Sequence, residues 1–344
     1  MSAGFRNAAL AFFLLCFQSS LESLEPKRPP NVLFIAIDDL NDWIGCLGGH
    51  PQAVTPNLDR LAAGGTLFTN AQCVAPGCNP SRAALLMGVP PHESGVYGNL
   101  EPIDDSPLLR GLTSLPGYFK AQGYQTLGIG KIFHGRSQSP GDWTNWYPPQ
   151  GTRGFWTKGT PGKKDPPLNG LPELKKRQSS ADWGPIGTKD MDHRDYKRAD
   201  WAAKQLEKTY DKPFFLAVGL YKPHFPWFAP KKYFDALPVD KIQPPKIKED
   251  DLKDIPKIGK DFAAPHKFHE PLKKAGKTKE GIQAYLACIH FIDACIGRIL
   301  EGLEQGPHKD NTIICLWSDH GWHLGEKLHW SKFTLWEESA RSVL

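Results

Sequence analysis

Hydrophobic residues in this chain fall into continuous runs, and several of these runs stop abruptly at polar side chains. Residues 31–37 (NVLFIAI), 126–132 (TLGIGKI) and 312–318 (TIICLWS) are largely apolar, and 212–227 (KPFFLAVGLYKPHFPW) begins in the same way. A strand that is buried on both faces, as in a parallel sheet, has this pattern. We therefore predict four core strands, the third of which leads into a proline-bounded loop that carries His224.

Helical patterns alternate with these strands. Residues 55–65 (TPNLDRLAAGG) place Thr55 at an N-cap, Pro56 at the first helical position and glycines at the end. Residues 113–124 predict a further helix, and residues 278–305 predict a long amphipathic one. The alternation predicts an α/β fold in which helices cover both sides of a mainly parallel sheet, and we find no internal repeat.

The stretch CVAPGCNPSRAALLMG, residues 73–88, joins a glycine turn to a helical apolar pattern. We expect Pro80 to start this helix and the AALLMG segment to anchor it in the core. Cys78 would then lie close to a helix N-terminus, where the free N–H groups favour negative charge. A buried thiol, a disulfide with Cys73 and a catalytic residue all remain open at this point, since four intervening residues allow such a bridge.

Composition places the chain among globular proteins. Its 344 residues suffice for one large domain or two ordinary ones, with 40% hydrophobic and 23% charged residues. The net charge is only +5, but lysines crowd two proline-rich stretches near 150–180 and 230–278. We interpret both stretches as surface insertions without helices, because a helix could not carry so many lysines and prolines on one face. No recognised nucleic-acid-binding module surrounds either stretch. A rim that attracts an anionic substrate is the alternative.

The N-terminus has the pattern of a secretory signal. Arg6 precedes the apolar residues 8–17 (AALAFFLLCF), and small and polar residues follow. Because this run is too short to span a bilayer, we predict a signal peptide of about residues 1–24, no membrane span after its cleavage, and a secreted or periplasmic protein, or a lysosomal-type one in a eukaryote. A lipid anchor through Cys16 and an uncleaved anchor are the alternatives. The six later cysteines fit neither a compact disulfide scaffold nor a CxxC zinc site.

Three predicted strands end in side chains that can bind a ligand: Asp38 and Asp39, then Lys131 with His134, then Asp319 and His320. In open α/β sheets, ligands bind beyond the carboxyl ends of the strands. Three carboxylates that converge there repel one another unless a cation neutralises them. Oxygen ligands in that number suit Ca²⁺ or Mg²⁺ better than zinc.

Basic residues accompany these strand ends and the helix that follows Cys78. A metal ion and several cations around one nucleophile form the arrangement that holds a tetrahedral oxyanion during its displacement. The implied substrate is a sulfate or a phosphate ester. The basic residues in question are Arg82, Lys131, His134, His224 and Lys332.

Five ordered sequence blocks carry a resemblance to a known family. They are IAIDDLNDWIGCLGGH, CNPSR, GYQTLGIGKIFHG, YKPHFPW and SDHGWHLGEKLHWSK. In these blocks the chain resembles the type I, formylglycine-dependent sulfatases of the alkaline-phosphatase superfamily, and it looks most like the iduronate-2-sulfatases and their bacterial relatives.

The resemblance implies a specific mechanism. A separate maturation enzyme would oxidise Cys78 to formylglycine, and one oxygen of the hydrated aldehyde would attack sulfur. The second hydroxyl would then expel sulfate. Calcium, the usual cation in relatives, would bind residue 78 with Asp38, Asp39, Asp319 and His320. Arg82 would steady the diol, Lys131 and His134 would bind and activate it, and His224 and Lys332 would contact the sulfate, one of them protonating the leaving alcohol.

We therefore expect a hydrolase that removes sulfate from a sulfated carbohydrate. A phosphate mono- or diester hydrolase of the same superfamily and an inactive homologue are the alternatives. Relatives in this family continue into another core strand and a smaller C-terminal subdomain, whereas this sequence ends at Leu344. We expect residues 25–344 to form a sulfatase catalytic domain that is shortened at its C-terminus.

Overall fold

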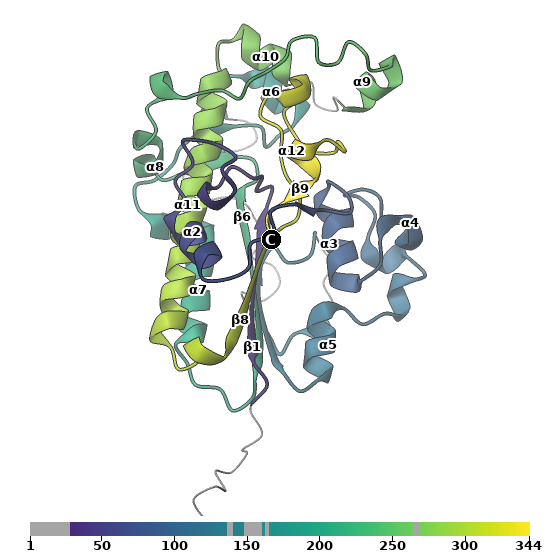
Figure 1. Cartoon of the computed structure of the whole chain (residues 1–344), viewed down its shortest axis with the longest axis vertical. Helices are drawn as coiled ribbons and strands as arrows, with labels where there is room; N and C mark the ends of the chain where they lie inside the picture. Colours follow the sequence, from purple (N-terminus) through teal and green to yellow (C-terminus); the bar gives the residue numbers. More distant parts are fainter. Residues whose placement is uncertain (1–27, 136–139, 148–159, 162–164, 264–267) are drawn as a thin grey trace, which may run out of the picture. The chain divides into compact units, whose positions relative to one another are not determined.

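A five-stranded parallel sheet lies at the centre of residues 31–344 in the computed structural model (Figure 1). The structure describes residues 28–344 apart from 136–139, 148–159, 162–164 and 264–267, so the expected signal peptide lies outside the described residues. The strand order is β4-β3-β6-β1-β8. The strands are β1 (Asn31–Asp38), β3 (Gln125–Gly130), β4 (Asn145–Tyr147), β6 (Phe214–Pro223) and β8 (Thr312–Ser318). The predicted parallel sheet is confirmed, and β4 is a fifth strand that the sequence analysis did not predict.

Helices cover both faces of this sheet, as predicted. The long α11 (Thr278–Gln305) packs with α7 (Arg194–Leu206) and α2 (Pro56–Ala63) on one face, and α3 (Cys78–Met87) and α5 (Leu115–Ala121) lie on the other (Figure 1). Strand β1 serves both layers, because Leu33, Ile35 and Ile37 join one hydrophobic cluster while Phe34 and Ala36 join the second. Among the described helices, none is both long and apolar enough to cross a membrane.

Shorter elements complete the fold. Two small sheets pair β2 (Ala71–Gln72) with β9 (Arg341–Ser342) and β5 (Trp183–Pro185) with β7 (Trp227–Ala229). The remaining α-helices are α4 (Pro91–Ser94), α6 (Pro172–Arg177), α8 (Lys231–Asp235), α9 (Lys257–Ala263), α10 (His269–Lys274) and α12 (Glu337–Ala340). Single 3₁₀ turns occupy Gly45–Leu47, Ile103–Asp105, Leu109–Gly111, Pro140–Asp142, Asp190–Asp192, Val239–Lys241, Lys309–Asn311 and Glu326–Leu328.

The expectation that the lysine-rich stretches contain no helix is wrong. Helix α6 forms within the first stretch, and α8, α9 and α10 form within the second. A helix of six residues needs only one apolar anchor rather than a continuous face. Leu174 of α6 and Leu272 of α10 supply it, since each is 1% exposed, while Lys176, Lys273 and Lys274 stay in solvent.

Candidate active site

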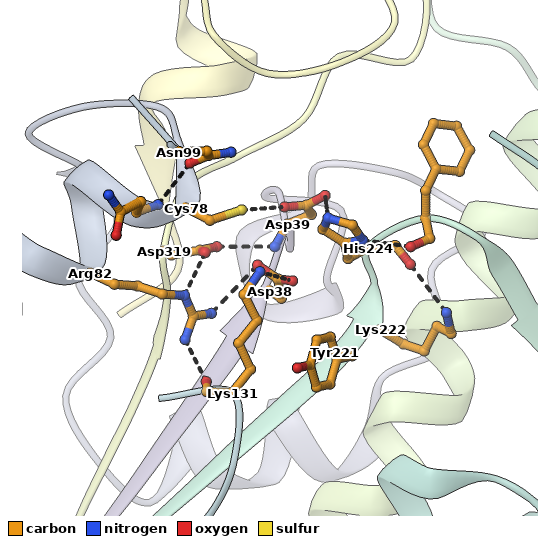
Figure 2. Close-up of polar contacts among 12 residues, drawn as sticks. Asp38, Asp39, Cys78, Arg82, Asn99, Lys131, Tyr221, Lys222, His224 and Asp319 are labelled. Atoms are coloured by element: carbon orange, nitrogen blue, oxygen red, sulfur yellow. Dashed lines mark hydrogen bonds and ion pairs between the residues drawn. The ribbon is translucent and has the colours of Figure 1, made fainter. Parts of the chain in front are cut away.

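Five ligand-capable side chains meet where β1 and β8 end and α3 begins. One ligand atom from each of Asp38, Asp39, Cys78, Asp319 and His320 lies within 4.8 Å of all the others. Each of these side chains is buried, and Figure 2 shows the three carboxylates and the thiol facing one another. The structure thus brings together every residue that the sequence proposed as a metal ligand.

The left-handed backbone conformation of Asp39 allows the side chains of Asp38 and Asp39, although consecutive, to point toward the same site. Asp39 has a φ of 63°, a conformation that few residues other than glycine adopt and that aspartate tolerates better than most. In an extended strand, neighbouring side chains point to opposite faces. The turn is held by the Asp39 N–H, which donates to Asp319 Oδ1 at 3.0 Å, and by the Tyr285 hydroxyl, which donates to the Asp39 carbonyl at 2.7 Å.

Helix α3 begins at Cys78, so the expectation that Pro80 starts it is wrong by two residues. Gly77 is the N-cap, and its carbonyl accepts the first helical bond from the Ser81 N–H at 3.0 Å. Proline fits anywhere in a first turn, because the N–H that it lacks has no helical partner there. The Asn99 side chain caps the new helix by accepting the Asn79 N–H at 2.9 Å. Cys78 therefore occupies the first helical position.

The Cys78 thiol is free and buried. All six cysteines of the described residues are unpaired, so the alternative of a Cys73–Cys78 disulfide is wrong. Burial and the Asp38 carboxylate raise the pKa of Cys78 to about 12, against the opposing charges of Lys131 and Lys332. Because the thiolate is the reactive form of cysteine, an unmodified Cys78 is a poor nucleophile at neutral pH.

Buried cations surround the carboxylates. The Arg82 guanidinium donates to Asp319 Oδ2 at 2.8 Å and approaches Asp38 Oδ1 at 3.5 Å. Lys131 Nζ lies 2.5 Å from Asp38 Oδ2. Lys332 Nζ lies 2.6 Å from Asp39 Oδ1 and 2.8 Å from Cys78 Sγ. Burial alone would raise the pKa of Asp38, but the positive charges of Lys131 and Arg82 hold it well below its ordinary value.

Three buried polar atoms of the cluster have no hydrogen-bond partner among the described residues: Asp38 Oδ1, Asp39 Oδ2 and His320 Nε2. The Nδ1 atom of His320 contacts the Gly321 carbonyl at 2.9 Å, which leaves Nε2 as the unprotonated nitrogen of a neutral ring. Nε2 nevertheless lies 3.5 Å from Asp39 Oδ1 and 3.6 Å from Asp319 Oδ1. A group of buried carboxylate oxygens beside an unprotonated imidazole nitrogen fits a divalent metal ion with mostly oxygen ligands.

Two histidines complete the set of predicted residues. His224 follows β6, and its Nε2 lies 3.9 Å from Asp39 Oδ2. Burial lowers the pKa of His224 to about 3; the cations Lys332 and Lys131 add to this effect, and Asp38 opposes it. Burial and the Lys131 charge likewise lower the pKa of His134 to about 3. His134 is therefore within electrostatic range of the same centre, and both rings are neutral at physiological pH.

Several supporting residues escaped the sequence analysis. The Ser81 hydroxyl donates to the Asp319 carbonyl at 2.5 Å, and Asn99 and Tyr285 make the bonds described above. The segment that carries Lys332 is held by His329, whose Nε2 contacts the Lys332 carbonyl at 3.0 Å. Ser81 and His329 belong to sequence blocks that the sequence analysis singled out, although neither was assigned a role. Asn99 and Tyr285 bond to groups far away in sequence, and motif spacing does not predict such contacts.

The carboxyl group of Glu326, in the segment before Lys332, should make the free energy of unfolding depend on pH. Burial, Glu338 and Asp42 raise its pKa from the ordinary 4.5 to about 7, whereas the Leu324 N–H, which donates to Oε2 at 2.7 Å, opposes the shift. Because the pKa of Glu326 is higher in the folded than in the unfolded state, its protonated carboxyl group stabilises the fold. This contribution is fully present below pH 4.5 and is lost as the pH rises through about 7.

We expect the free energy of unfolding in urea to fall by about 1–3 kcal/mol between pH 5 and pH 8 through this group. The Glu326→Gln variant should lose that part of the pH dependence. Glu304→Gln, which changes an exposed glutamate of α11, is the control. Equal slopes for Glu326→Gln and the unchanged protein would contradict the prediction.

Comparison with known proteins agrees with the geometry. A family model described as Sulfatase matches residues 30–344. The chain is 39% identical over 330 residues to a sulfatase of Formosa agariphila, with 92% of this chain and 63% of the relative covered. It is 30% identical over 367 residues to the iduronate 2-sulfatase of Mus musculus, with 97% and 62% covered. The chain therefore spans less than two thirds of the length of either relative.

Solved structures show the same fold. One of them, determined in complex with its substrate D-glucosamine-2-N,6-O-disulfate, superposes with a TM-score of 0.67 at 21% sequence identity. The superposition covers 92% of this chain and 70% of that one. At this level of identity the similarity concerns the fold, and it matches the predicted α/β architecture.

Proposed function

We propose that this chain, which belongs to the sulfatase family, hydrolyses sulfate esters at the cluster of side chains around Cys78. The observation that carries the proposal is the set of buried carboxylates and unpaired ligand atoms around residue 78, enclosed by Arg82, Lys131 and Lys332. Such a site offers a tetrahedral anion several fixed positive charges in a water-poor environment.

A divalent cation, Ca²⁺ or alternatively Mg²⁺, would be held by Asp38, Asp39, Asp319, His320 and residue 78. When bound, it would supply positive charge against the sulfate oxygens and the nucleophile. Arg82 and Lys131 would balance the remaining negative charge of the carboxylates, because each already forms an ion pair with one of them.

Residue 78 would work as formylglycine rather than as cysteine. The buried thiol, with its pKa raised to about 12, is a weak nucleophile. Attack through sulfur would also leave no easy way to release the sulfate. A formylglycine-generating enzyme is therefore the proposed maturation partner, and the hydrated aldehyde would supply the attacking oxygen, with Lys131 and His134 assisting its deprotonation.

His224 and Lys332 would contact the transferred sulfate, and we assign the proton donation to His224. Its ring is neutral before the ester binds, and the negative charge of the bound ester would favour the imidazolium form, whose Nε2 proton would pass to the leaving alcohol. Lys332 lies within hydrogen-bond distance of Asp39 and Cys78, and its pKa is raised. Burial opposes this shift, and the negative charge of Asp39 is its main cause. An ammonium group in that state stabilises negative charge better than it gives up a proton. Because a good leaving group needs no proton, the loss of a general acid is felt most with poor leaving groups.

The assignment to His224 predicts a dependence on the leaving group. The His224→Ala variant should lose about 10²–10⁴-fold in kcat on an alkyl sulfate and much less on 4-nitrophenyl sulfate. Lys332→Met should lose activity on both esters to a similar extent. Steady-state kinetics on the two esters measure this difference, and the reverse pattern would assign the proton to Lys332.

The proposed reaction is tested by comparing 4-nitrophenyl sulfate with 4-nitrophenyl phosphate. Protein that is coexpressed with a formylglycine-generating enzyme should turn over the sulfate at least about tenfold faster, which corresponds to 1.4 kcal/mol. Preference for the phosphate would instead support a phosphate mono- or diester hydrolase, since both anions are tetrahedral.

The substrate class that we propose is a sulfated carbohydrate, in line with the iduronate 2-sulfatase relative. A sulfate-release screen over glycosaminoglycan and algal oligosaccharides identifies the sugar. Residues 1–24 support export, and the proposed location is therefore secreted or periplasmic, or lysosomal-type in a eukaryote.

A further inference from the structure

Strand β6 leaves the sheet ladder just before His224. Ile37 of β1 pairs with Leu220, and the next residue, Asp38, pairs with Pro223. Tyr221 and Lys222 therefore form a bulge without ladder partners on β1. Bulges re-aim the chain at active sites, and this one immediately precedes His224.

The amide groups of the bulge bind a buried carboxylate instead. Asp195 of α7, which is 4% exposed, accepts the Tyr221 N–H through Oδ1 and the Lys222 N–H through Oδ2, both at 3.0 Å. Arg198, one turn further along α7, lies 2.5 Å from Asp195 Oδ1 and places its guanidinium 4.5 Å from the Tyr221 ring centroid. The bulge is thus fixed to the helix layer of the fold.

The Lys222 side chain fixes the other side of the same loop. Its ammonium group donates to the His224 carbonyl at 3.1 Å (Figure 2). It also donates to the Pro226 carbonyl. The His224 N–H in turn donates to the Tyr221 carbonyl at 2.8 Å. The residue that carries the imidazole is therefore bonded through both its N–H and its C=O.

Burying this ammonium group is costly, because Lys222 is only 5% exposed and the acceptors named above are carbonyls rather than carboxylates. A methionine of similar length would fill the same space without that cost. Stability alone therefore does not explain a lysine here, whereas control of the loop geometry does.

We propose that Lys222 is a positioning residue, which fixes the loop from His224 to Pro226 and so sets the His224 imidazole against the Asp39 side of the active site. The inference rests on the proposed function, because it gives His224 a role in the reaction. A displacement of about 1 Å at a catalytic group can lower kcat about 100-fold.

A double-mutant cycle tests this inference, with kcat on an alkyl sulfate as the measurement. In matured protein, Lys222→Met should lower kcat about 100-fold, with a smaller loss on 4-nitrophenyl sulfate. In the His224→Ala background the same substitution should change kcat less than about threefold, because the group that it positions is absent. Lys204→Met, at an exposed lysine of α7, should leave kcat unchanged.

The outcomes separate the two proposals. An active wild type whose Lys222→Met variant keeps full kcat, or loses the same factor with and without His224, contradicts only the role of Lys222. A matured wild type that releases no sulfate contradicts the proposed function and the role of Lys222 with it. If Lys222→Met does not fold, as seen by circular dichroism, Asp195→Asn replaces it in the cycle and the same non-additivity is expected.

Discussion

Cys78→Ala is expected to abolish sulfate release, with a loss of at least about 10⁴-fold in kcat, because it removes the only source of the proposed nucleophile. In the unchanged protein, coexpressed with a formylglycine-generating enzyme, the peptide that contains residue 78 should be about 18 Da lighter than the cysteine form, as thiol-to-aldehyde conversion requires. Mass spectrometry of a tryptic digest measures this loss, and 4-nitrophenyl sulfate turnover measures the activity.

Cys73→Ala is the matched control. Cys73 lies five residues before Cys78, its thiol is also free, and burial raises its pKa to about 12 as well. The surroundings of Cys73 differ from those of Cys78, since Cys73 Sγ lies 3.9 Å from the Ser339 carbonyl, whereas Cys78 Sγ lies against Lys332 and Asp39. This variant should keep both the mass loss and the activity. Sulfate release by protein whose residue 78 is entirely cysteine would overturn the formylglycine proposal.

Four of the five strands and the carboxylates of the metal-ligand cluster could be predicted from the sequence because both follow from strand burial, whereas Cys78 was named as a ligand only through the family resemblance. A strand such as 31–37, covered on both faces, leaves a continuous apolar run, and the residue at which the run stops marks the carboxyl edge of the sheet. Asp38 and Asp319 end neighbouring parallel strands, so their proximity follows from topology although 281 positions separate them.

The support of the site could not be predicted in this way. Lys222 stands in the quoted block YKPHFPW, but its role depends on a bulge that shifts the pairing between Ile37 and Asp38. Asp195 becomes part of the site only because α7 lies against that bulge. Asn99 caps α3 from a loop twenty residues away. Such contacts depend on tertiary register, and neither apolar period nor motif spacing encodes that register locally.

Removal of the divalent cation is expected to lower both the activity and the melting temperature. Asp38 Oδ1, Asp39 Oδ2 and His320 Nε2 are buried and have no hydrogen-bond partner among the described residues, and all three belong to residues of the proposed metal-ligand cluster. An ion present at 1,000 times its dissociation constant stabilises the folded chain by about 4 kcal/mol. Chelation with EGTA or EDTA, followed by dialysis, should therefore shift melting by several degrees and reduce kcat at least about 100-fold, and added Ca²⁺ should restore both.

The Asp319→Asn variant tests binding of the ion independently of catalysis, because the measurement is the change in melting temperature when Ca²⁺ is added. The substitution removes one ligand charge and weakens the ion pair with Arg82, so the rise in melting temperature on adding Ca²⁺ should largely disappear. Asp42→Asn is the control, since Asp42 lies three residues after Asp39 but pairs with Arg341 outside the cluster; its calcium response should equal that of the unchanged protein. An equal calcium response in Asp319→Asn would show that the ion does not bind among these carboxylates, and Arg82, Lys131 and Lys332 would then be the groups that balance their charge.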